Sequence, residues 1–68
     1  MFKQREVMKF DGAIISRELL EEIHYCDYVY AIDHNGYSGT YTNCYWFTIE
    51  FRNGKQIDVY VKESEYNV

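Results

Sequence analysis

The sequence predicts an α+β fold in a single small domain. Its 68 residues suit one domain, and a share of 47% hydrophobic and 19% aromatic residues is typical of a chain that folds around a core. One segment has apolar residues at helical spacing, and three others are rich in β-branched and aromatic residues. With a further short strand near the N-terminus, these segments predict the order β-α-β-β-β over residues 1–68. The expected architecture is an antiparallel sheet of three to four strands with one helix packed on one face.

The first predicted strand covers residues 5–10, with the sequence REVMKF. Its apolar members are Val7, Met8 and Phe10, so the alternation typical of a half-buried strand is imperfect. Asp11-Gly12 follows and favours a turn. We therefore expect this segment to supply an edge strand.

The predicted helix lies within residues 15–26, ISRELLEEIHYC. Ser16 suits the N-cap position, where its hydroxyl accepts a hydrogen bond from a free amide of the first turn. Leu19, Leu20 and Ile23 then share one side of the helix, and glutamates occupy much of the remainder. A helix this short is only marginally stable alone, so its apolar side is expected to pack on the sheet.

The remaining strands are predicted at residues 28–33, 44–52 and 55–63. All three combine β-branched and aromatic residues, which are enriched in strands. Within residues 44–52, large apolar side chains recur at every second position, so these side chains share the face that packs on the core. The members of this core face are Tyr45, Phe47, Ile49 and Phe51.

The loop between the last two strands contains an Asn-Gly pair, which usually forms a two-residue hairpin turn. That turn would bury Asp58 and expose the aliphatic residues beside it, because a shift of one residue moves every side chain to the opposite face. A three-residue loop over residues 52–54 instead places Ile49 opposite Ile57. Burial contributes about 1.5–3 kcal/mol for each aliphatic side chain, which outweighs a turn preference. We therefore predict the longer loop, with Gly54 in the left-handed region.

This register places aromatic and acidic side chains together on the face opposite the core. Such a mixture resembles the composition of hot spots in protein interfaces, so the face is predicted to bind a partner. The predicted binding residues on it are Trp46, Tyr60, Glu50 and Asp58, with Tyr28 and Tyr30 extending it. Alternatively, the Trp-Tyr pair only stabilises the hairpin, or the N-terminal segment folds over it.

Residues 34–43, HNGYSGTYTN, are predicted to form a loop. Tyr37 and Tyr41 are accompanied there by Gly, Ser and Asn, a mixture typical of binding loops. Both tyrosines are therefore added to the predicted partner-binding residues. The alternative is a long hairpin connection whose tyrosines pack back on the sheet. The polar residues 63–68 are expected to fray.

Charge and targeting signals narrow the classes of partner. The net charge of −4 and a pI near 4.9 disfavour duplex nucleic acid and anionic membranes, which both require a positive surface. Neither a signal peptide nor a stretch long enough to span a membrane is found, which predicts an intracellular, cytoplasmic protein. Cys26 and Cys44 are then expected to be reduced thiols, although a secreted chain would allow them to pair.

The sequence indicates no catalytic residues, metal ligands or cofactor. His24, Cys26, His34 and Cys44 lack the close ligand pairs that structural zinc sites show. Acidic neighbours such as Glu22 and Asp27 would raise, not lower, the pKa of a thiol nearby, and no phosphate-binding or nucleophile motif is present. The chain is therefore predicted not to be an enzyme.

The predicted function is non-catalytic protein binding, by a small inhibitor or accessory protein that occludes its partner. Small acidic domains that phages and mobile elements use against host nucleic-acid enzymes provide an analogy of size and composition. Two alternatives remain: a homodimeric structural protein that uses the same face, and a single-stranded nucleic-acid binder that stacks bases on exposed rings.

Overall fold

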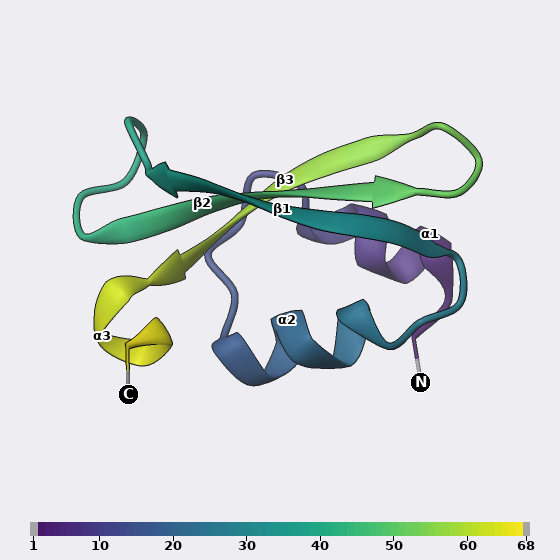
Figure 1. Cartoon of the computed structure of the whole chain (residues 1–68), viewed down its shortest axis with the longest axis horizontal. Helices are drawn as coiled ribbons and strands as arrows, with labels where there is room; N and C mark the ends of the chain where they lie inside the picture. Colours follow the sequence, from purple (N-terminus) through teal and green to yellow (C-terminus); the bar gives the residue numbers. More distant parts are fainter. Residues whose placement is uncertain (1, 68) are drawn as a thin grey trace.

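The computed structural model describes residues 2–67 and shows a three-stranded antiparallel sheet with helices on one of its faces (Figure 1). The strands follow one another in space as they do in sequence, in the order β1-β2-β3. The elements are α1 (Gln4–Val7), the 3₁₀ turn η1 (Met8–Phe10), α2 (Arg17–His24), β1 (Val29–Tyr37), β2 (Cys44–Phe51), β3 (Gln56–Lys62) and α3 (Glu63–Tyr66). The small α+β class predicted from the sequence is confirmed.

The hairpin of β2 and β3 has the predicted register. Ile49 lies opposite Ile57, and Trp46 lies opposite Tyr60. The loop between the strands is the three-residue one: the Phe51 amide donates to the Lys55 carbonyl at 2.8 Å, and Gly54 has φ +89°. A side chain at this φ would meet its own backbone, so glycine is the residue that closes this turn without strain.

Helix α2 begins where the sequence predicted. The Ser16 hydroxyl accepts a hydrogen bond from the Leu19 amide at 3.1 Å, which satisfies one of the free donors of the first turn. Leu20 and Ile23 turn toward the sheet and are buried, as is Cys26 just beyond the helix. The core lies between this side of α2 and the inner face of the sheet, whose buried residues are Val29, Phe47, Ile49, Phe51, Ile57, Val59 and Val61.

The strand predicted at residues 5–10 was wrong, because this segment is helical in α1 and η1. A strand would have placed Val7 on the same side as two basic residues. The helical turn instead buries Val7 fully in the core and sets the Phe10 ring against Phe2 at 6.1 Å. The Glu6 carboxylate accepts a hydrogen bond from the Lys3 amide at 2.8 Å and so satisfies a donor at the start of the helix.

Residues 11–15, not 5–10, run along the outer edge of β3. The Gly12 amide donates to the Asp58 carbonyl at 2.7 Å, and the Tyr60 amide donates to the Ala13 carbonyl at 3.0 Å. Ile14 and Tyr60 form an isolated parallel bridge. This segment covers part of the β3 edge without forming a fourth strand, so the predicted β-α-β-β-β order does not describe the structure.

Strand β1 is longer than predicted and irregular. It continues through residues 34–37, which the sequence assigned to a loop, so that the β1–β2 connection shrinks to residues 38–43. The pairing with β2 slips by one residue between Val29 and Ala31 and again between His34 and Tyr37, where Gly36 has φ +90°. Such bulges increase the local twist of a strand.

The C-terminal residues do not fray as predicted, because residues 63–66 form the short helix α3. The ring of Tyr66 packs on Phe47 and Tyr45, with centroids 5.4 and 5.2 Å away. This contact has no signal in the sequence, since one tyrosine among polar residues has no periodicity. Within residues 2–67, no helix has both the length and the apolar character that a membrane span requires.

Candidate functional site

The candidate site is the face of the sheet turned away from the helices. In Figure 1 the sheet is seen nearly edge-on, with α1, α2 and α3 all on the same side of it. We call the opposite side the outer face. Its central side chains are Asp33, Trp46, Thr48, Glu50, Asp58 and Tyr60, which the strand register places together. The sequence predicted four of them as binding residues, and Asp33 and Thr48 complete the set.

A chain of hydrogen bonds crosses the outer face. The carboxylate of Asp58 accepts from the Trp46 indole N–H and from the Thr48 hydroxyl, both at 3.1 Å. Thr48 in turn accepts from the amide of Asn35 at 2.8 Å. The indole is thereby held in one orientation although 37% of the residue is exposed. A ring fixed in this way loses little conformational freedom when a partner covers it.

Two further carboxyl groups give the outer face its charge. Asp33 and Glu50 approach each other from β1 and β2, and a hydrogen bond with Asp33, together with its negative charge, raises the pKa of Glu50 above its usual range. At neutral pH such neighbouring carboxylates repel each other. A cation from a partner would relieve this repulsion, so the outer face is complementary to basic groups.

Tyr41 joins the outer face from the β1–β2 connection. Its ring meets Tyr60 edge-on, with centroids 4.7 Å apart, and its hydroxyl donates to the Gly12 carbonyl at 2.9 Å. The connection is shaped by Ser38, whose hydroxyl accepts from the amides of Thr40 and Tyr41 at 2.9 Å. Tyr41 therefore packs back on the sheet, as the alternative interpretation held, and enlarges its aromatic surface.

Tyr30 lies at the first bulge of β1 and is 68% exposed. It lines a shallow depression together with Glu50 and Gln56, two residues of the outer face near the 52–54 turn. Tyr30 thus extends the acidic and aromatic surface as expected from the sequence.

Tyr28 does not extend the outer face, contrary to the sequence-based expectation. Its ring packs on Phe51 of the core face, and its hydroxyl donates to the Phe2 carbonyl. Desolvation, and then the neighbouring Cys26, raise the pKa of this phenol. The expectation failed because Tyr28 lies in the turn before β1, where the Val29 amide donates to the Cys26 carbonyl at 3.1 Å, so the alternation of the strand does not extend to it.

Tyr37 also lies apart from the outer face. It ends β1 opposite Tyr45, a residue of the core face, and their rings stack with centroids 4.9 Å apart. The hydrogen bond with Tyr45, and then the charge of Glu63, raise the pKa of Tyr37 to about 12. The two tyrosines assigned to one loop therefore lie on opposite sides of the sheet.

The side chains considered as metal ligands or nucleophiles do not form a cluster among the described residues. Among the described residues, no set of three or more His, Cys, Asp or Glu side chains could hold a metal ion. Cys26 and Cys44 are buried free thiols. The outer face carries rings, carboxylates and amides on the strands of the sheet.

No protein-family model matches this chain, and the searches of curated proteins and of solved structures found no significant match.

Proposed function

We propose that this chain is a non-catalytic protein-binding module of the inhibitor or accessory type. Its outer face would dock on a positively charged surface of a partner and occlude it. The observation that carries the proposal is the indole of Trp46, which is partly exposed yet anchored on Asp58 at 3.1 Å, with the Asp33–Glu50 pair on the same face. Aromatic residues pre-oriented among polar groups are common at the energetic centres of interfaces.

Charge favours a partner with a basic surface. The centre of the outer face carries three carboxylates. The basic residues that strand alternation assigns to this face lie at its ends: Arg52 in the turn after β2, and Lys62 at the end of β3. The basic groove of a nucleic-acid enzyme, such as a phage or mobile element would target, has the matching chemistry. Electrostatic attraction of this kind weakens as salt is added.

The test is an affinity capture from the host cell with three matched baits: the parent, Trp46→Ala and Tyr25→Ala. Tyr25 is the matched control because it is 79% exposed and lies at the end of α2, on the helix side of the sheet. We expect a protein that the parent and the Tyr25 variant capture and the Trp46 variant loses, with at least a tenfold weaker Kd. Capture that is equal for all three baits would contradict the proposal.

Light scattering on the same three proteins separates occlusion of a partner from self-association. We expect a monomer in each case. A parent dimer that dissociates on Trp46→Ala would instead assign the outer face to a second copy of the chain.

A further inference from the structure

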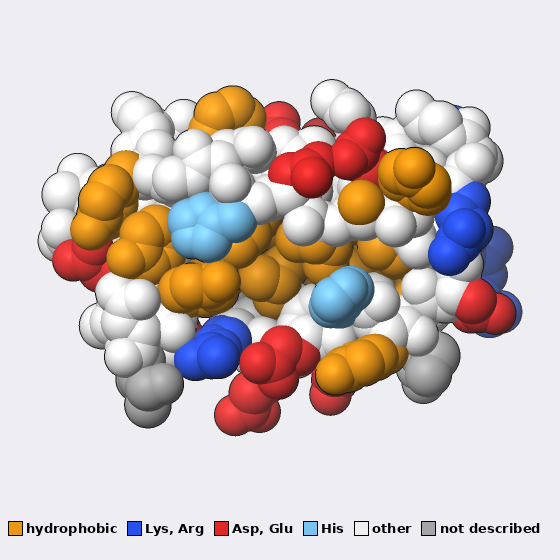
Figure 2. Space-filling model, viewed as in Figure 1, with side chains coloured by type: hydrophobic (Ala, Val, Ile, Leu, Met, Phe, Trp, Pro, Cys, Tyr) orange, Lys and Arg blue, Asp and Glu red, His pale blue; other side chains and the backbone are white. Residues whose placement is uncertain are grey.

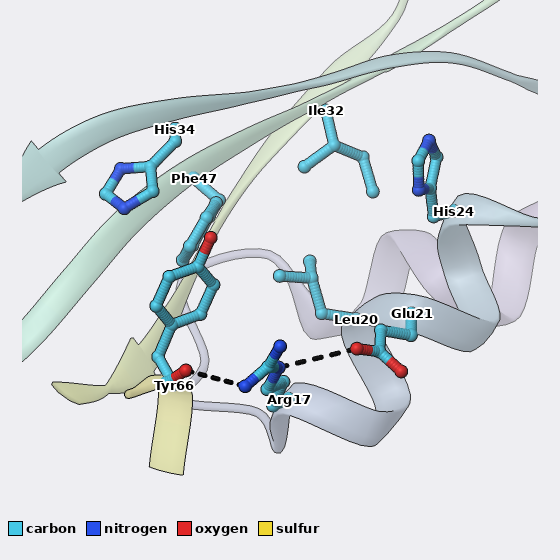
Figure 3. Close-up of a pocket in the computed structure, with 8 residues that line it drawn as sticks. All are labelled: Arg17, Leu20, Glu21, His24, Ile32, His34, Phe47 and Tyr66. Atoms are coloured by element: carbon cyan, nitrogen blue, oxygen red, sulfur yellow. Dashed lines mark hydrogen bonds and ion pairs between the residues drawn. The ribbon is translucent and has the colours of Figure 1, made fainter. Parts of the chain in front are cut away.

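A second surface lies on the other side of the sheet, where β1 passes over α2. A pocket of about 220 Å³ opens there. Leu20 of α2, Ile32 of β1 and Phe47 of β2 form its apolar walls, and Tyr66 of α3 closes one end beside His34 (Figure 3). We call this pocket and the adjoining edge of β1 the β1–α2 groove.

The groove runs along an open edge of the sheet. Within residues 2–67, β1 has one strand neighbour, β2, whereas the opposite edge at β3 is partly covered by residues 11–15. An edge strand presents main-chain donors and acceptors to any extended segment that lies beside it. Ile32 and His34 are two residues apart on β1 and both line the pocket. Every second side chain of an added strand would therefore point over the pocket.

The size of the pocket indicates what enters it. Sites for small molecules usually measure about 300–1,000 Å³, so a pocket of about 220 Å³ is small for such a ligand. It suits one aliphatic or aromatic side chain. An anchor of that kind, combined with main-chain pairing, is the recognition mode of peptide-binding sheet edges.

The charges beside the groove favour a basic segment. Figure 2 shows a band of hydrophobic side chains between the sheet and α2, with acidic side chains above and below it. On the helix side these acids include Glu21, which lines the pocket, and Glu18, which lies in the first turn of α2 and is exposed. Arg17 is the basic residue at the rim, where it pairs with Glu21 at 3.4 Å and donates to the Tyr66 carbonyl at 2.7 Å.

A second copy of the chain fits this edge poorly. The two bulges leave a regular stretch of β1 only from Ala31 to His34, and bulges of this kind limit the pairing of one long edge with another. Each copy also carries a net charge of −4. A short basic segment avoids both obstacles.

We propose that the β1–α2 groove binds an extended basic segment of a partner protein, which adds to β1 as a fourth strand and places one apolar side chain in the pocket. This site is separate from the outer face and does not depend on the function proposed for it.

The experiment uses labelled octapeptides in which lysines and threonines surround one central Leu, Ile, Phe or Tyr. Binding to the isotope-labelled chain is followed by amide NMR and fluorescence anisotropy. We expect shifts at Ile32, His34 and Leu20. Three altered peptides test the mode of binding: Ser in place of the anchor, Glu in place of Lys, and N-methyl groups on the amides that would face β1. Each should weaken the Kd by about fivefold or more.

Variants of the protein provide the second arm. Ile32→Ala removes a pocket wall and should weaken the best peptide by about fivefold, whereas Trp46→Ala on the outer face should leave its Kd unchanged. The peptide series keeps the test decisive if Ile32→Ala does not fold. The proposal is overturned if no peptide of the panel shifts the groove residues at millimolar concentration. Shifts confined to the outer face, N-methylated peptides that bind equally well, or a dimer formed through β1 would also overturn it.

Discussion

Two side chains of the same strand, β2, have opposite surroundings. Ile49 is fully buried beneath the helices, whereas Trp46, three residues earlier, is 37% exposed and bonded to Asp58. Both lie on the same rigid backbone, so the alternation of the strand alone separates them. The inner face forms the core of the domain, and the outer face is the one for which we propose a binding role. Substitutions on the inner face should therefore mainly lower stability, whereas substitutions on the outer face should have smaller effects on stability.

The largest expected effect is on the inner face. Ile49→Ala should lower the free energy of unfolding by about 2–5 kcal/mol, since it removes buried methyl groups and leaves a cavity. A domain this small has about 3–5 kcal/mol in total, so much of the variant should be unfolded at 25 °C. Urea titration followed by circular dichroism measures the loss.

The matched control for Ile49→Ala is Thr48→Ala, on the adjacent residue of the outer face. It removes a hydroxyl that donates to Asp58 and should cost about 0.5–1.5 kcal/mol. An equal loss of unfolding free energy in the two variants would show that both faces contribute alike to stability, and would contradict the assignment of the core to the inner face alone.

A smaller loss of stability is expected in the 52–54 turn, whose length sets the register of β2 and β3. Gly54→Ala forces a Cβ into the left-handed region, at φ +89°, and should cost about 1–2 kcal/mol although no atom outside residues 53–55 lies within 4 Å of the added carbon. Gly39→Ala is the control, because Gly39 also has open space but no positive φ. Urea titration should show little loss for Gly39→Ala; a comparable loss in both variants would remove the conformational explanation.

The smallest effect is electrostatic and confined to the outer face. Asp33→Asn should lower the pKa of Glu50, because it removes the negative charge that raises it and replaces a carboxylate with an amide whose N–H groups can donate to ionised Glu50. In the parent, the folded state holds the Glu50 proton to higher pH than the unfolded state does. Stability conferred by this proton is therefore lost as pH rises through the raised pKa. Carboxyl-carbon NMR titration measures the shift, and an unchanged pKa of Glu50 in Asp33→Asn would contradict the assigned cause.

The sequence was informative where the pattern was regular and local. Apolar residues at every second position of β2 and β3 determined the hairpin register, and Ser16 marked the start of α2. Their physical signals, burial and capping, act within a few residues. The same register correctly placed Trp46 and Asp58 on one face, and with them the centre of the candidate site.

Other features depended on contacts between distant segments. Val7, Met8 and Phe10 fit a strand or a helix almost equally, and only packing on the core selects the helix. Tyr28 lies in the turn before β1 and packs on Phe51, and the residue at which a strand begins leaves little trace in a single sequence. Tyr66, which closes the pocket of the β1–α2 groove, packs on strands far from it in the chain.

The hydrogen bonds that residues 11–15 make along β3 have a consequence for assembly. A sheet with two open edges can grow from both, and identical units can then stack without limit. Here the chain occupies one of these edges with its own backbone over Asp58–Tyr60. Growth by strand pairing is thereby hindered at the β3 edge, which favours a complex of defined stoichiometry over a filament.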